Sequence, residues 1–343
     1  MKDKEKDKPP SIQEWKDLYN AAMEFKRIEC WNWMRDSDLF GVQNPVNGEI
    51  GYCCIMGMLG RHFALAVYQG TEGLEGYLKI QSGEVDLHPA EALHLQKCLS
   101  VSFENRKFLN KKDLQLIKAL NLKFRGHDSW PLFRSYLPGY LPWYLTQKEA
   151  KYLTLCLWQT IDVALRFKDD RAMLYAPMKN RYLVRVPIKN GLKWKGEWLE
   201  PSKRKKEEII AEPDVNRLEE LEKMKRRGVW EIDFVYSPYG IREKGERPYY
   251  PYIILWVDHR SGLILHHHIV KSTEFAFEFP EQNLKFVKKF GSLPREILVK
   301  REEIFRLLKP VAFKLEIELS KNKKLTMVKR VVEDMFESSS GER

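Results

Sequence analysis

The stretch from Trp230 to Lys271 decides the fold of the second half of this 343-residue chain. It reads WEIDFVYS at 230–237, PYYPYIILWVD at 248–258 and LILHHHIVK at 263–271. Each run is rich in the β-branched and aromatic side chains that favour strands, and the short turn HRSG separates the last two runs. The pattern predicts a meander of three antiparallel strands.

The sequence after this meander alternates between helical and strand patterns. The spacing of its apolar residues predicts helices over Phe275–Phe290, Glu302–Phe313 and Leu325–Phe336. The short runs EILVK at 296–300 and LEIELS at 315–320 predict strands. The predicted order of elements is therefore βββαβαβα, and the predicted fold class of the whole chain is α+β.

Three short motifs accompany this order of elements. They are W-x-x-D at Trp230 and Asp233, V-D-x-x-S-G at Val257–Gly262, and G-x-L-P-x-x-I at Gly291–Ile297. Together with the order of elements, they resemble the ribonuclease H-like catalytic core of retroviral integrases and DDE transposases, over about residues 228–337. The resemblance implies a mixed sheet with the strand order 3-2-1-4-5.

The resemblance also implies where metal-binding carboxylates would lie, because those enzymes hold two divalent metal ions through hard oxygen ligands. Asp233 matches the first acidic position. Glu333 lies beside Asp334 and one helical turn before Glu337, and it matches the third position. The resemblance implies that these carboxylates lie close together across the first strand and the last helix.

The second acidic position falls in V-K-R-E at 299–302, where Lys300 and Arg301 stand in the acidic place and Lys300 replaces the acidic ligand itself. A cation at this place repels Mg²⁺ and removes one anchoring oxygen. We therefore expect no metal site, no cofactor and no enzymatic activity, and we regard Asp233, Glu333 and Glu337 as remnants of a catalytic site. Mg²⁺ would be needed only if the domain were an active enzyme.

The first half is predicted to be a separate α+β domain. A helix is expected over Ser11–Arg27, where Ser11 and Glu14 form a capping-box pattern, and another after Thr146 to Phe167. The other predicted elements are strands at 50–59 and 62–68, helices at 71–80, 90–100 and 111–120, a wrapped Pro-rich loop at 129–146, and a hairpin of strands at 182–188 and 192–200.

A charged run, SKRKKEE at 202–208, separates the two halves, because so many charges cannot pack into a core. The predicted domains are thus residues 1–200, of unknown function, a charged linker and helix at 201–227, and the ribonuclease H-like domain at 228–337. The stretch from Trp33 to Leu74, with WEIDF and YYPYIILWVD, resembles a widespread set of uncharacterised prokaryotic proteins that pair two domains of unknown function.

The net charge of +11 is spread over both halves of the chain. Such a balance is compatible with nucleic-acid binding without demonstrating it. Contacts through dispersed Lys and Arg would be sequence-tolerant and salt-dependent, and the other possible partner is a protein. The candidate nucleic-acid-binding residues are Lys203, Arg204, Lys205 and Lys206 in the linker, and Lys321, Lys323, Lys324, Lys329 and Arg330 on or before the last helix.

The remaining composition favours the cytoplasm. The 5 cysteines form no C-x-x-C pair and are expected to be buried reduced thiols. The start MKDKEKDKPP lacks an apolar signal region, and no stretch approaches the roughly 18 apolar residues that cross a membrane, so no membrane partner is expected. The motifs of nucleotide hydrolases, dinucleotide-binding enzymes, esterases and zinc proteases are absent from the sequence.

Four further features have both a functional and a structural interpretation, and we favour the structural one for each. The run His266–His268 could bind a metal ion but has no acidic residue at ligand spacing in the sequence. Asp36–Asp38 fits a helix cap and turn. Cys53 and Cys54 point to opposite faces of a strand rather than toward His62. The aromatic residues of 125–144 could stack bases, but they fit a lid packed on the core.

The sequence favours a binding function without catalysis for the ribonuclease H-like domain. Two alternatives remain open. One is a metal-dependent nuclease or strand-transfer enzyme, and the other is a protein-interaction module that does not bind nucleic acid.

Overall fold

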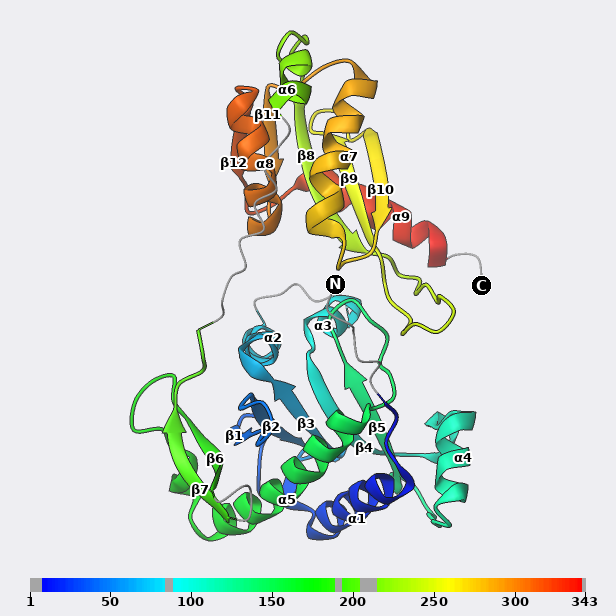
Figure 1. Ribbon diagram of the computed structural model, residues 1–343, viewed down its shortest axis with the longest axis vertical. Helices are drawn as coiled ribbons and strands as arrows, with labels where there is room; N and C mark the ends of the chain where they lie inside the picture. The colour runs from blue at the N-terminus through cyan, green and yellow to red at the C-terminus, as the bar shows by residue number, and fades with distance from the viewer. Residues whose placement is uncertain (1–7, 84–88, 189–192, 204–214, 341–343) are drawn as a thin grey trace. The chain divides into compact units, whose positions relative to one another are not determined.

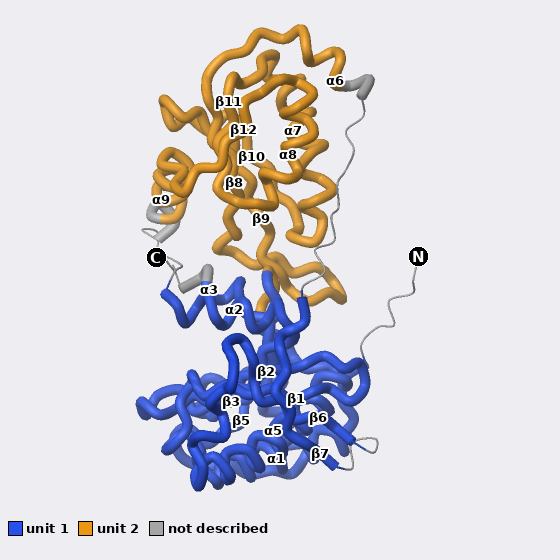
Figure 2. The backbone as a smooth tube through the Cα atoms, turned by 90° about the vertical axis from the view of Figure 1, so that its left-hand side faces the viewer, with its two compact units in different colours: residues 1–138, 142–205 blue, residues 139–141, 206–343 orange. Residues whose placement is uncertain are grey.

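The computed structural model describes the chain except residues 1–7, 84–88, 189–192, 204–214 and 341–343 (Figure 1). The chain forms two compact units, which Figure 2 shows in different colours. Unit 1 comprises residues 1–138 and 142–205, and unit 2 comprises residues 139–141 and 206–343. Most of the charged run in the predicted linker lies outside the described residues. None of the described helices combines the length and the apolar character needed to cross a membrane.

Unit 1 is an α+β domain built on one seven-stranded sheet. Its strands are β1 (Phe40–Gln43), β2 (Ile50–Met56), β3 (Ala64–Gln69), β4 (Cys98–Glu104), β5 (Trp130–Tyr136), β6 (Tyr182–Ile188) and β7 (Lys193–Leu199). Its helices are α1 (Ile12–Ile28), α2 (Gly70–Ser82), α3 (Pro89–Leu95), α4 (Lys111–Ala119) and α5 (Gln147–Asp169). The strand order is β5-β4-β3-β2-β1-β6-β7, with β1 and β6 parallel and the other neighbours antiparallel.

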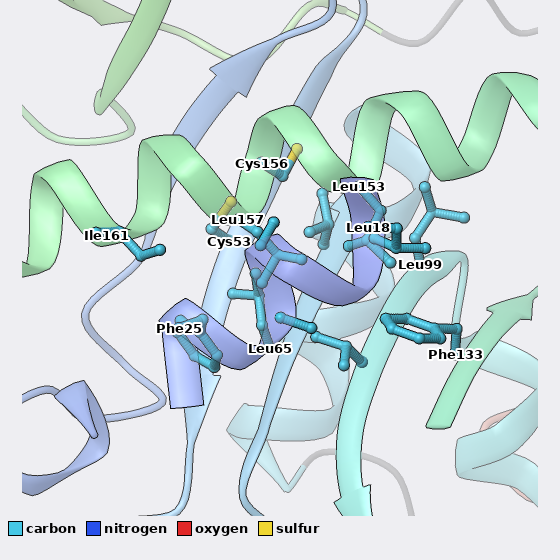
Figure 3. Close-up of a cluster of buried hydrophobic side chains, with 14 of the residues drawn as sticks. Leu18, Phe25, Cys53, Leu65, Leu99, Phe133, Leu153, Cys156, Leu157 and Ile161 are labelled. Carbon is cyan, nitrogen blue, oxygen red and sulfur yellow. The ribbon is translucent and has the colours of Figure 1, made fainter. Parts of the chain in front are cut away.

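The main core of unit 1 lies between the sheet and the helices α1 and α5. Leu18 of α1 and Leu153 of α5 meet Leu65 and Leu99 of the sheet there, and all four are fully buried (Figure 3). The predicted capping box at the start of α1 is confirmed, because Ser11 and Glu14 bond each other's backbone N–H. The spacing of apolar residues in both helices therefore reflects one buried face.

The sheet of unit 1 buries side chains on both faces, and Cys53 and Cys54 show this directly. Cys53 lies in the core with α5, whereas Cys54 lies on the other face in a cluster with Tyr77 of α2. The Cys54 thiol and the Tyr77 hydroxyl both donate to the backbone carbonyl of Asp36. Burial also raises the pKa of Cys54, which disfavours the nucleophilic thiolate. The pair acts as core packing, as expected from the alternation of a strand.

Two predictions for unit 1 are wrong in the same way, because strands are present where other structure was expected. The predicted helix at 90–100 ends at Leu95 and is followed by β4. The predicted loop at 129–146 contains β5. Proline at 131 favoured a loop, but β5 is the edge strand of the sheet, where a residue without an N–H is tolerated. The short strand β1 was also not predicted.

Unit 2 contains a five-stranded mixed sheet with the order β10-β9-β8-β11-β12. The strands are β8 (Val229–Tyr236), β9 (Tyr252–Asp258), β10 (Ile264–Val270), β11 (Glu296–Val299) and β12 (Glu318–Lys321). The helices are α6 (Val215–Glu222), α7 (Phe275–Phe290), α8 (Glu302–Lys314) and α9 (Thr326–Ser340). The first three strands pair antiparallel, and β11 runs parallel to both β8 and β12.

This arrangement confirms the predicted order of elements, βββαβαβα, and the predicted strand order 3-2-1-4-5. The meander and the two αβ units fall where the sequence predicted them. The helix predicted within the segment 201–227 is α6, which ends at Glu222. Helices α7 and α8 bury one face of the sheet, and α9 buries the other.

Candidate functional site around Asp233

The central strand β8 carries two buried carboxylates on the face that α9 covers. Trp230, Ile232 and Phe234 point into the core with α7 and α8. The intervening side chains of Glu231 and Asp233 therefore lie on the opposite face. Both residues are buried, with exposed fractions of 1% and 7%. A carboxylate at such depth requires charged or hydrogen-bonding partners.

Asp233 is paired with Arg301. The Nε of Arg301 donates to Oδ1 of Asp233 over 2.8 Å, and a terminal nitrogen of the same guanidinium donates to the carbonyl of Phe234 over 3.3 Å. The guanidinium also lies 4.4 Å from the centroid of the Phe234 ring. The backbone N–H of Phe234 donates to the same Oδ1 over 2.9 Å. The carboxylate expected at the first metal-binding position is thus held in an ion pair.

The topology of the sheet brings Arg301 to Asp233. Strand β11 pairs parallel with β8, and Val299 lies opposite Ile232. The strand ends there, and Arg301 occupies the cap position before α8. Arg301 thereby comes within hydrogen-bond distance of Asp233. The sequence analysis placed Lys300 at the second acidic position; in the structure it is Arg301, the next residue, that bonds Asp233, whereas Lys300 is exposed.

Glu333, the candidate for the third position, has a different partner. The buried face of α9 includes Val328 and Val331, whereas the Glu333 side chain is 56% exposed and lies 3.6 Å from Lys329 Nζ. Glu337 lies one turn further along the helix, and its side chain is outside the described residues. Within the described residues, no group of three His, Cys, Asp or Glu side chains could hold a metal ion.

The sequence analysis missed the role of Glu231. Its Oε2 accepts hydrogen bonds from the backbone N–H groups of Met327 and Val328, over 3.0 and 2.9 Å, at the start of α9. Its Oε1 lies 2.6 Å from Nδ1 of His259. A carboxylate at a helix N-terminus satisfies free N–H groups and complements the helix dipole. The signal in the sequence was a second carboxylate, two residues before Asp233, in a strand whose other residues are apolar or aromatic.

The other motif residues serve turns and helix ends. Oδ1 of Asp258 accepts from the backbone N–H and the hydroxyl of Ser261, which closes the turn between β9 and β10. Gly291 ends α7 with a φ of 76°, a left-handed conformation that favours glycine. These positions of the integrase-like motifs therefore have structural roles in this chain.

The three histidines of β10 are partly buried against α7 or exposed. His266 stacks on Phe286 with ring centroids 4.9 Å apart, and burial lowers its pKa. His268 Nε2 lies 3.0 Å from a carboxylate oxygen of Glu278. Glu278 comes close to His268 because α7 packs on β10. The sequence showed no acidic residue at ligand spacing because this contact depends on the packing and not on the local sequence.

Most of the described candidate cations near α9 already have acidic partners. Lys321 pairs with Glu302 over 2.7 Å, Lys329 with Glu333, and Arg330 with Asp334. Lys323 and Lys324 are exposed in the turn between β12 and α9. Among the linker candidates, Lys203 is exposed, whereas Arg204, Lys205 and Lys206 lie outside the described residues.

Two family models match adjacent parts of the chain. Residues 15–185 match a domain of unknown function (DUF7309), and residues 214–336 match a second domain of unknown function (DUF6930). No curated protein matches the chain. These two matches fall one in each half of the sequence, on either side of the charged run.

Comparison with solved structures finds a chain from the simian T-cell lymphotropic virus intasome in complex with PP2A regulatory subunit B56 gamma. It is 16% identical, with a TM-score of 0.26, and the match covers 35% of the present chain and 45% of that chain. At this TM-score the similarity carries no conclusion about fold or function. The family matches do support a conclusion. The chain pairs two adjacent domains of unknown function, DUF7309 and DUF6930, and this pairing supports a family that is defined by it.

Proposed function

We propose that unit 2 is a ribonuclease H-like domain that binds a partner without metal-dependent catalysis. The observation that supports this is the ion pair between Asp233 and Arg301. A metal ion that catalyses phosphodiester cleavage needs several carboxylate oxygens. Here Lys300 replaces the acidic residue at the second position in the integrase pattern, and the guanidinium of the adjacent Arg301 pairs with the carboxylate of Asp233.

The electrostatic repulsion expected between Arg301 and a metal ion at Asp233 supports binding without catalysis. Two unit charges 4 Å apart interact by about 4 kcal/mol near a protein surface. A divalent cation beside the guanidinium of Arg301 would meet a repulsion of about twice that size. It would also have to replace the hydrogen bond from Arg301 to Asp233.

We expect the purified protein to cleave neither single- nor double-stranded DNA or RNA in the presence of Mg²⁺ or Mn²⁺. The assay uses end-labelled substrates with each metal, and the Asp233→Asn variant is its matched control. Any residual cleavage should be equal in the wild type and in Asp233→Asn, which would identify it as contamination. Metal-dependent cleavage that disappears in Asp233→Asn would favour the nuclease or strand-transfer alternative.

Nucleic acid as the partner stays a prediction. Binding through Lys203, Lys323 and Lys324 should tolerate changes of sequence and weaken strongly between about 50 mM and about 200 mM salt, because it releases counterions. A titration of a labelled oligonucleotide at both salt concentrations measures this. Charge reversal at Lys323 and Lys324 should weaken binding more than the same change at the control residues Lys285 and Lys309. Absence of binding at the lower salt concentration would favour a protein partner.

A further inference from the structure

Unit 1 contains an aromatic cavity that is separate from the site in unit 2. Its volume is about 110 Å³, and the rings of Trp15, Tyr19, Phe133 and Tyr144 contribute to its walls. These residues come from α1, from β5 and from the segment just before α5. Tyr19 and Phe133 meet edge to face with centroids 4.9 Å apart, so the walls present both ring faces and ring edges.

The size of this cavity matches one small ring. An apolar cavity of about 150 Å³ holds a benzene molecule, so a space of this order admits a six-membered ring and little more. The aromatic walls favour a planar apolar body through edge-to-face contacts. A nucleic-acid strand, which needs a continuous groove along its backbone, does not fit this description.

Tyr19 brings a phenol hydroxyl to the residues that line the cavity. The residue as a whole is only 3% exposed. Burial, with Asp113 nearby, raises the pKa of Tyr19, so the hydroxyl keeps its proton at neutral pH. A protonated phenol can donate a hydrogen bond to an oxygen of a ligand in the cavity.

The charges around the cavity favour an anionic ligand. Asp113 lines the cavity, but both of its oxygens accept hydrogen bonds from Arg134, over 2.9 and 2.6 Å, so its charge is balanced. Lys112 also lines the cavity, and its Nζ lies 3.8 Å from the centroid of the Tyr144 ring. The three charges sum to one net positive charge, which Lys112 supplies.

We propose that this cavity binds a small aromatic carboxylate. The ring of the ligand lies between Trp15, Tyr19 and Phe133, and its carboxylate accepts a hydrogen bond from the Tyr19 hydroxyl and faces the ammonium of Lys112. This site does not depend on the function proposed for unit 2.

The test is a ¹⁹F NMR titration of the full chain with 4-fluorobenzoate, with 4-fluorobenzyl alcohol and 4-fluorobenzylamine as probes that differ mainly in charge. Saturable binding of the benzoate is expected, about tenfold tighter than that of the amine, because Lys112 attracts the first and repels the second. Absence of saturable benzoate binding would overturn the proposal, and so would equal or tighter binding of the amine.

Three variants assign the effect to this cavity. Tyr19→Phe keeps the ring and removes the hydroxyl, and it should weaken benzoate binding about fivefold. Lys112→Gln should also weaken it, while changing the affinity for the neutral alcohol little. Lys118→Gln removes an exposed charge from the same helix outside the cavity and should leave binding unchanged. Equal losses in Lys112→Gln and Lys118→Gln would contradict the proposed position of the carboxylate.

Discussion

Replacement of Arg301 by Ala is expected to lower the free energy of unfolding of unit 2 by about 2–3 kcal/mol. Removal of one partner of a buried ion pair typically costs about 3–5 kcal/mol, because the other charge remains buried. The Asp233 side chain is 9% exposed, but Arg301 is 41% exposed, so water entering in place of the guanidinium reduces the loss. Urea unfolding monitored by tryptophan fluorescence measures the change.

A double-mutant cycle separates the ion pair from the general effect of each substitution. The double variant with Asp233→Asn and Arg301→Met should have a free energy of unfolding about 1–3 kcal/mol higher than the value expected from adding the losses in the two single variants. The control is Arg306→Ala, which removes an exposed pair with Glu302 on α8 and should cost about 0.5 kcal/mol or less. If Arg301→Ala cost no more than Arg306→Ala, the pair would not hold Asp233 as described.

Replacement of Glu231 by Ala is expected to destabilise unit 2 by about 2–4 kcal/mol and to loosen the start of α9. The change removes the acceptor of two backbone hydrogen bonds and the partner of His259, and buried donors left without acceptors cost about 1–3 kcal/mol each before water relieves them. Amide hydrogen exchange should accelerate most at Met327 and Val328.

Two further variants test this account of α9. Glu231→Gln keeps one acceptor oxygen and should lose less stability than Glu231→Ala. Glu333→Ala removes an exposed carboxylate from the same helix and should change the free energy of unfolding by about 0.5 kcal/mol or less. Exchange at Met327 and Val328 that is unchanged in Glu231→Ala would show that the carboxylate does not anchor the helix.

The order of elements in unit 2 could be predicted from sequence because its strands are short runs rich in β-branched and aromatic residues, bounded by turn residues. The predicted bounds of helix α7 are those seen in the structure, because the spacing of its apolar residues indicates one buried face. Unit 1 was harder. The helical spacing over 90–100 ran into β4, and Pro131 in β5 looked like a loop residue until the sheet order placed that strand at an edge.

The candidate site could be predicted only in part. The resemblance identified Asp233 and placed Lys300 at the second acidic position, but the contact of Arg301 rather than Lys300 with Asp233 depends on where β11 ends beside β8. The role of Glu231 depends on the position of the α9 N-terminus, about 95 residues later in the chain. A local sequence pattern does not predict contacts between residues so far apart in the sequence. The aromatic cavity likewise joins α1, α4 and β5.

The claim that the Asp233–Arg301 pair excludes a metal ion is tested most directly by titrating Mn²⁺ with the protein and recording the electron paramagnetic resonance of the free ion. The wild type and Asp233→Asn are expected to give the same signal, with only weak and nonsaturable loss of free Mn²⁺. Saturable binding of Mn²⁺ by the wild type that Asp233→Asn abolishes would contradict the claim.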